Sequence, residues 1–351
     1  MSNSEDYQHL IVCAHGIHGQ PADFSYLHEC IQSSSSSYGR IYNLVTSSTT
    51  GKTKEGIETN AQRIIEEIKQ CCLKMNKLKY ISLVGFSLGG LFLRYAIKEL
   101  YDPATHRIAN LEPIDFVTIA TPHLGVWSYN YLHLPKFFIP VVAYFMGKSG
   151  YELFLIDQDK ISREQEDCLK TPLLFTLTNP LYLQSLSAFK RRHLYATLRK
   201  DFSVPVETAA IDPFISKDSI CKQASSHWPH RWFYAEGSII MEISNAHDSA
   251  FSFNSSSHDE VLDAKDASLS KEREYYFSFS SDTLPNRIQL EKEMAYRLNS
   301  VGWSKVIVDF PILFPSAHTQ INACGGGSLK YHLNSGGRPI MDHLVNFLLK
   351  E

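Results

Sequence analysis

Apolar and polar positions along the chain follow two periods. Short apolar runs predict buried β-strands at residues 10–14, 40–45, 80–84, 116–120, 193–198 and 305–310. Elsewhere, apolar residues recur at helical spacing with polar residues between them, which predicts amphipathic helices at residues 57–75, 88–100 and 340–349. This alternation predicts an α/β fold with a mostly parallel central sheet and helices on both faces. Ligands of such sheets lie beyond the carboxyl ends of the strands, so chemically important residues are expected after strands.

Two stretches interrupt this pattern within what we interpret as a single domain over residues 1–351. Residues 127–160 are rich in aromatic side chains and are expected to form a lid or cap segment. Residues 213–282 follow neither period and contain serine-rich patches. We therefore expect them to form an irregular, partly flexible insertion.

Composition limits the classes of partner. The chain is 44% hydrophobic and 20% charged, with a net charge of -3 at pH 7. Because it has no global basic field, no nucleic-acid partner is expected. The 7 cysteines are odd in number and form no C-x-x-C pair, which favours reduced thiols in a cytoplasmic protein over disulfides or structural zinc. The first residues do not resemble a signal peptide, and no apolar stretch reaches the ~20 residues that cross a bilayer.

A candidate nucleophile stands between a predicted strand and a predicted helix. The segment reads Gly85-Phe86-Ser87-Leu88-Gly89-Gly90, the G-x-S-x-G arrangement in its strand-to-helix context. Glycines are needed there because a side chain would collide with neighbouring backbone in so tight a turn. The turn raises the Ser87 hydroxyl above the sheet, at a helix N-terminus. A turn that merely packs closely is the alternative, but the strand before it and the helix after it favour a nucleophile.

The end of the first predicted strand offers candidate oxyanion donors. It reads His15-Gly16-Ile17-His18-Gly19. We assign the backbone N–H groups of Ile17 and Leu88 to the oxyanion hole, which would hold the negative charge of a tetrahedral intermediate. His15 is expected to make structural hydrogen bonds. His18 is a candidate substrate contact.

A serine nucleophile requires a histidine base and a carboxylate that orients it, in the chain order serine, acid, histidine. Asp201 follows the predicted strand at 193–198 and is the best candidate acid, whereas Asp309 lies inside a predicted strand. His318 follows the strand at 305–310 and is the best candidate base. His343 lies midway along the last helix, which is a poor position for a base.

These residues resemble the DUF676 family of serine esterases, a lipase-like set of α/β-hydrolases. The likeness lies in residues 14–19, 84–97, 118–125, 194–209 and 316–318. The resemblance implies the triad Ser87, Asp201 and His318, the α/β-hydrolase fold and hydrolysis of carboxylic esters, including lipid acyl esters. It also implies a lipid or ester substrate and peripheral association with a membrane or lipid-droplet surface. No metal or organic cofactor is expected. Phe86 stands where the family often has histidine.

Three further residues are candidate substrate contacts. His123 follows the strand at 116–120, where it would shape the pocket wall or touch substrate. Phe137 and Phe138 belong to the aromatic segment, which would either line an acyl pocket and touch a lipid surface or simply pack on the domain. Both interpretations of the segment remain open at this point.

Two rival functions remain open. Thioester hydrolysis or acyl transfer would use the same triad. A non-catalytic lipid-binding protein on a hydrolase fold is the alternative of a different class, and a complete Ser–Asp–His set argues against it.

Overall fold

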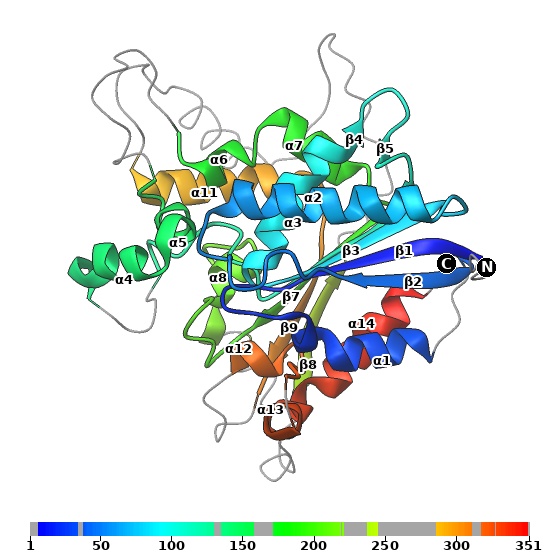
Figure 1. The fold of residues 1–351 in the computed structure, drawn as a ribbon. Helices are drawn as coiled ribbons and strands as arrows, with labels where there is room; N and C mark the ends of the chain where they lie inside the picture. The colour runs from blue at the N-terminus through cyan, green and yellow to red at the C-terminus, as the bar shows by residue number, and fades with distance from the viewer. Residues whose placement is uncertain are drawn as a thin grey trace, which may run out of the picture.

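The described part of the chain is built around one mixed sheet. The computed structural model describes residues 6–33, 38–129, 135–157, 171–218, 220, 237–244, 286–310, 317–326 and 328–349. Within them, a seven-stranded sheet has the order β2-β1-β3-β6-β7-β9-β8 (Figure 1). Its strands are β1 (Tyr7–Ala14), β2 (Arg40–Val45), β3 (Tyr80–Phe86), β6 (Glu112–Ile119), β7 (Arg191–Thr197), β8 (Ser238–Ser244) and β9 (Ser304–Asp309). Every neighbouring pair is parallel except β8 with β9, so the predicted mostly parallel sheet is confirmed.

Helices cover both faces of the sheet (Figure 1). One face packs against α2 (Ile57–Lys74), α3 (Leu88–Leu100), α7 (Pro180–Ser187) and α11 (Arg287–Asn299), and the other against α1 (Ser25–Gln32) and α14 (Arg338–Leu348). Alternate residues of β1 serve the two cores, with Leu10 and Val12 in one and Ile11 and Cys13 in the other. Burial on both faces explains why the strands are continuous apolar runs.

Shorter elements complete the described structure. They are η1 (Pro21–Phe24), β4 (Tyr101–Asp102), β5 (Arg107–Ile108), η3 (Lys136–Phe138), α4 (Ile139–Phe145), α5 (Gly147–Leu153), α6 (Leu173–Thr176), α8 (Val206–Ala209), α12 (Ala317–Gln320), α13 (Ser328–Leu333) and η4 (Ser335–Gly337). Among the described helices, none combines the length and the apolar character needed to cross a bilayer.

Strand β8 corrects the sequence analysis. It lies inside residues 213–282, which we expected to be irregular, yet it pairs antiparallel with β9 at the edge of the sheet. The expectation is therefore wrong for residues 238–244. Residues 221–236 and 245–282 lie outside the described residues, so the expected flexibility concerns a part of the chain that the structure does not describe.

The aromatic segment projects from one side of the body. Of residues 127–160, the structure describes 127–129 and 135–157, which contain η3, α4 and α5. In Figure 1, α4 extends outward at the left, and α5 lies between it and the body. The remaining residues of the predicted cap, 130–134 and 158–160, lie outside the described residues.

A buried polar network ties the strands together near their amino ends. The Asp115 carboxylate on β6 accepts two hydrogen bonds from Arg191 on β7, at 2.7 and 3.0 Å. Ser82 on β3 also donates to Asp115 (3.3 Å), and the His9 ring nitrogen Nε2 on β1 lies 2.9 Å from the Ser82 hydroxyl. The serine, histidine and aspartate side chains are fully buried, so this set joins four strands and is closed to substrate.

Removal of the Asp115 carboxylate should destabilise the fold without affecting the carboxyl ends of the strands. Asp115→Ala leaves a partly buried guanidinium without its carboxylate, which should lower the free energy of unfolding by about 3 kcal/mol. Urea denaturation measures this change. Glu112→Ala on the same strand is the control, because Glu112 pairs with Lys190 at the surface and such pairs contribute about 1 kcal/mol or less. Equal losses in both variants would contradict the assignment.

Candidate active site

Ser87 occupies a strained turn between β3 and α3. Its backbone has φ 54° and ψ −127°, a conformation that side-chain-bearing residues rarely adopt. The Ser87 N–H donates to the Ile119 carbonyl on β6 at 2.8 Å, and the Ser87 carbonyl accepts from the Gly90 N–H at 3.1 Å. These bonds hold the turn from both sides. The structure therefore contains the predicted elbow, with Ser87 at its apex.

The glycines on either side of Ser87 are required by close backbone contact. A Cβ atom on Gly89 would lie 2.0 Å from the Ala14 carbonyl oxygen of β1. A Cβ atom on Gly85 would lie 2.4 Å from the Gly90 Cα. Both distances are far inside van der Waals contact, so the G-x-S-x-G spacing reflects the packing of β1, β3 and α3.

Ser87, His318 and Asp201 form a continuous chain of hydrogen bonds. His318 Nε2 lies 3.0 Å from Ser87 Oγ, and His318 Nδ1 lies 2.7 Å from Asp201 Oδ2. The three side chains come from the β3–α3 turn, α12 and the loop after β7, separated by 231 and 117 residues in sequence. The structure thus brings together the three residues that the sequence analysis selected.

The surroundings of Asp201 define the direction of these bonds. Its other oxygen, Oδ1, accepts the backbone N–H groups of Ser203 (3.0 Å) and Val204 (2.8 Å). The acid therefore acts as an acceptor on both oxygens, and His318 Nδ1 donates to it. In the neutral imidazole this leaves the lone pair on Nε2 facing Ser87, whose hydroxyl donates. Asp201 has a side chain that is only 1% exposed, whereas that of His318 is 17% exposed and reaches the cavity.

The rejected alternatives lie elsewhere and have other partners. Asp309 forms an ion pair with Arg199. His343 on α14 shares a hydrogen bond with the Tyr195 hydroxyl at 3.0 Å.

The two residues of the predicted oxyanion hole line the same cavity. Ile17 and Leu88 both line the cavity beside Ser87, and a Cβ atom on Gly16 would lie only 2.6 Å from the Ser87 Cβ. Among the described residues, neither the Ile17 nor the Leu88 N–H has a hydrogen-bond acceptor. The adjacent His15 is buried and bonds to the Gly16 carbonyl (3.1 Å) and the Thr49 hydroxyl (3.1 Å), as expected of a structural histidine.

A cavity of about 560 Å³ opens above the serine. Its lining includes the apolar residues Ile17, Phe86, Leu88, Pro122, Val126, Met146, Leu153, Val204 and Leu333. It also includes the polar residues His18, Asp23, Thr319, Gln320, Lys330 and Asn334. A lining with both kinds of side chain would suit an amphiphilic ligand.

His18 and His123 have different positions. His18 is exposed and lines the cavity, where substrate contact is possible. His123 is fully buried, and its ring bonds to Thr118 (2.9 Å) and stacks edge-on against Trp303. Burial holds the pKa of His123 well below its usual range, so the ring is neutral. The candidate substrate contact at His123 is therefore wrong, since the side chain serves the core.

The sequence analysis missed Arg94, which fixes the loop containing His123. This guanidinium is buried in α3 and donates to the backbone carbonyls of His123 (3.2 Å) and Leu177 (3.1 Å). Burial lowers its pKa to about 9. A lone cation inside the apolar run Leu91-Phe92-Leu93-Arg94-Tyr95 was the available signal.

Phe137 and Phe138 are also placed differently from the expectation. They lie on η3 with exposed fractions of 74% and 44%, and neither belongs to the described residues that line the cavity. Direct contact with a substrate held at Ser87 is therefore contradicted in this arrangement. Among the residues of η3 and α4, only Ile139 and Ala143 are buried, so the Phe137 and Phe138 side chains lie outside the core.

Within the described ranges, no group of three or more His, Cys, Asp or Glu side chains is arranged to hold a metal ion.

The parallel sheet, the strained serine turn and the acid and base after later strands define an α/β-hydrolase. The chain belongs to the family described as "Putative serine esterase (DUF676)", whose model matches residues 4–218.

Curated relatives agree with this family assignment. The chain is 31% identical to "Putative lipase ROG1" of Saccharomyces cerevisiae over 222 residues, which are 62% of this chain and 30% of the relative. It is 30% identical to "Putative lipase C4A8.10" of Schizosaccharomyces pombe over 217 residues, which are 58% of this chain and 26% of the relative. The match thus spans less than a third of either relative's length.

Similar solved structures include phospholipase PlaB of Legionella pneumophila, at 12% identity and a TM-score of 0.38, covering 55% of this chain and 39% of that one. A lipase-esterase related protein of Clostridium acetobutylicum is 14% identical with a TM-score of 0.34, covering 59% and 81% of the two chains.

A methyl group at Gly89 should disrupt the elbow. Gly89→Ala places a Cβ against the Ala14 carbonyl, so the turn must shift and Ser87 should lose its position. We expect at least a tenfold lower rate of reaction of Ser87 with a fluorophosphonate, measured by gel fluorescence. Gly51→Ala is the control, because nothing lies within 4 Å of a Cβ atom added at Gly51, which has a positive φ. Only backbone strain of about 1 kcal/mol is expected there. An unchanged rate in Gly89→Ala would contradict this account of the turn.

Proposed function

We propose that this protein is a serine hydrolase that cleaves carboxylic esters of lipids through an acyl-enzyme intermediate. The observation that carries the proposal is the hydrogen-bonded chain Ser87–His318–Asp201 beneath a cavity that is lined in part by apolar side chains. The printed names of the curated relatives, which call them lipases, support the same class of reaction.

The proposed reaction gives each of these residues a role. His318 Nε2 takes the hydroxyl proton as Ser87 Oγ attacks the ester carbonyl, and the carbonyl π electrons move to oxygen. The Ile17 and Leu88 N–H groups stabilise that oxyanion, and Asp201 stabilises the imidazolium. Collapse of the intermediate breaks the ester C–O bond, and His318 protonates the leaving alcohol. Water then attacks the acyl-serine with His318 as base, which releases the carboxylic acid and restores Ser87.

The cavity supports a lipid substrate. The apolar lining residues, among them Phe86 and Leu153, would hold the acyl chain, and burying each CH₂ group contributes about 0.8 kcal/mol. The polar lining residues would hold the alcohol portion of the ester. Thioester hydrolysis and acyl transfer could use the same residues, so the identity of the leaving group and of the acceptor distinguishes these reactions.

Covalent labelling tests the catalytic roles. The wild-type protein should react with a fluorophosphonate, and Ser87→Ala should not. Asp201→Asn should lower the hydrolysis rate by on the order of 10³–10⁴-fold, because the amide favours the wrong histidine tautomer. Ser33→Ala, at an exposed serine, is the control and should label normally. Equal labelling of wild type and Ser87→Ala would contradict Ser87 as the nucleophile, and a wild type that does not label would favour a non-catalytic lipid-binding protein.

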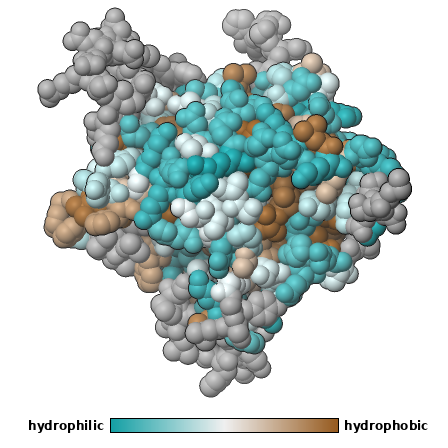
Figure 2. All heavy atoms as spheres, in the orientation of Figure 1, coloured by the Kyte–Doolittle hydropathy of each residue, from teal (hydrophilic) through white to brown (hydrophobic). Residues whose placement is uncertain are grey.

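We also propose that α4 places the enzyme on a lipid surface. Large apolar side chains are exposed on η3 and α4, namely Phe137, Phe138, Val141, Tyr144 and Phe145. Figure 2 shows this brown patch at the left edge, over α4. Met146, which follows α4 directly, lines the cavity. Chain adjacency thus links the patch to one apolar residue of the cavity lining, which supports transfer of an acyl chain from a lipid layer.

Replacement of the exposed aromatic side chains tests this surface. The triple variant Phe137→Ser, Tyr144→Ser and Phe145→Ser should bind phosphatidylcholine vesicles at least tenfold more weakly in a flotation assay, because it loses apolar area that would enter the lipid. Hydrolysis of a soluble short-chain ester should be unchanged. Leu73→Ser is the control, since Leu73 is 78% exposed on α2 outside this patch. Unchanged vesicle binding in the triple variant would contradict a docking role for α4.

A further inference from the structure

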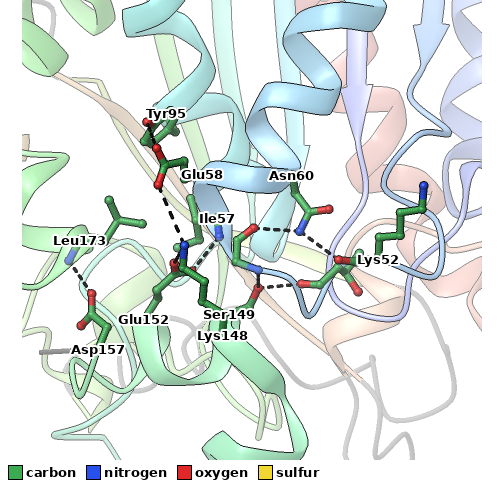
Figure 3. Close-up of polar contacts among 12 residues, drawn as sticks. Lys52, Ile57, Glu58, Asn60, Tyr95, Lys148, Ser149, Glu152, Asp157 and Leu173 are labelled. Atoms are coloured by element: carbon green, nitrogen blue, oxygen red, sulfur yellow. Dashed lines mark hydrogen bonds and ion pairs between the residues drawn. The ribbon is translucent and has the colours of Figure 1, made fainter. Parts of the chain in front are cut away.

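A buried glutamate that the catalytic chemistry does not use joins the aromatic segment to the body. Glu152 lies on α5, is 1% exposed, and accepts the backbone N–H of Ile57 at 2.7 Å (Figure 3). Ile57 is the first residue of α2, so the carboxylate satisfies one of the N–H groups that a helix leaves unpaired at its start. The helix dipole also favours a negative charge at this end.

Ser149 makes a second bridge to the same turn. Its hydroxyl accepts the Gly56 N–H at 3.1 Å and donates to the Thr53 carbonyl at 2.7 Å. A Cβ atom on Gly147 would lie 2.6 Å from the Lys54 carbonyl, so α5 and this turn are in direct backbone contact. Glu152 and Ser149 of α5 therefore supply hydrogen-bond partners for backbone groups within residues 53–57.

Two residues at the ends of α5 belong to the cavity. Met146 directly precedes α5 and Leu153 is its last residue, and both line the cavity. The Leu153 carbonyl accepts the N–H of Val126 at 2.9 Å, and Val126 lines the cavity as well. The position of α5 against α2 thus sets the position of three apolar residues in the cavity wall.

We propose that Glu152 is a positioning residue that determines acyl-chain selectivity by holding α5, and with it the apolar cavity wall, against the start of α2. This inference rests on the proposed ester hydrolysis. Glu152 contacts no reacting atom, and its effect passes through Met146, Leu153 and Val126.

Charged groups from each neighbouring element face this carboxylate. On α5, the Lys148 ammonium lies 3.9 Å from Glu152 and 4.0 Å from Glu58 of α2. Glu58 accepts a hydrogen bond from the Tyr95 hydroxyl of α3, and Asp157 follows α5. Burial raises the pKa of Glu152 to about 7; the Ile57 N–H and Lys148 lower it, whereas Asp157 and Glu58 raise it.

The direction of this pKa change predicts a pH effect. The folded protein favours neutral Glu152, so the related stability is present below the ordinary glutamate pKa and is lost as the pH rises through about 7. Glu152→Gln cannot ionise and keeps an oxygen that can accept from Ile57. The melting temperature of the wild type should therefore fall relative to that of Glu152→Gln between pH 5 and pH 8.5. A difference that does not change with pH would show that the carboxyl does not titrate in this range.

Hydrogen–deuterium exchange measures the positioning without any substrate. In Glu152→Leu the Ile57 N–H loses its acceptor, so we expect at least tenfold faster exchange in residues 146–153, with the β3–α3 turn unchanged. Ser149→Ala should have a smaller effect in the same residues and serves if Glu152→Leu does not fold. Glu66→Leu, at an exposed position on α2, is the control. Unchanged exchange in both α5 variants would overturn the positioning role.

Ester hydrolysis then tests selectivity. The ratio of kcat/KM for p-nitrophenyl decanoate to that for the acetate should fall at least fivefold in Glu152→Leu and return to near wild type in Glu152→Gln. Ser87 labelling by a small fluorophosphonate should stay within twofold in all variants. Equal losses on both esters would overturn the selectivity role and leave the proposed hydrolase intact. A wild type that neither labels nor hydrolyses would instead overturn the proposed function, whatever the exchange shows.

Discussion

The contact between Gly89 and the Ala14 carbonyl is the constraint on which the site depends. With a Cβ–oxygen distance of only 2.0 Å available, no side chain fits between the end of β1 and the start of α3. This closeness brings Gly16 and Ile17 beside Ser87, so the proposed nucleophile and both proposed oxyanion donors follow one pair of neighbouring strands. The positive φ of Ser87 is maintained by the same packing, together with the bond from its N–H to Ile119.

The acid and the base come from strands farther along the sheet. Asp201 lies after β7, and His318 lies after β9. Strands β7 and β9 are neighbours in the sheet. Asp201 is fixed by two N–H groups of its own loop, so its orientation does not depend on His318. The His318 ring contacts Phe86 as well, with the two ring centroids 5.0 Å apart.

The sequence predicted the parts of this structure that depend on local pattern. Apolar runs buried on both faces identify parallel strands, and the rule that chemistry follows strands was enough to select Asp201 and His318 among many candidates. Strand β8 was missed because it is an antiparallel edge strand within a serine-rich stretch and therefore lacks a fully apolar run. His123 was misjudged because its burial depends on Arg94 and Trp303, which are distant in sequence. An aromatic-rich segment does not reveal which of its rings face solvent, as Phe137 shows.

Glu152 illustrates the same limit with a functional consequence. A glutamate in a short helix predicts a solvent-exposed residue, and its burial here is compensated by the N–H at the start of α2 and by Lys148. Met146 and Leu153 of the cavity lining lie at the ends of α5, which is attached through Glu152 and Ser149. Because these attachments share no residue with the hydrogen-bonded chain at Ser87, we expect a change at α5 to alter the cavity wall and to leave that chain in place.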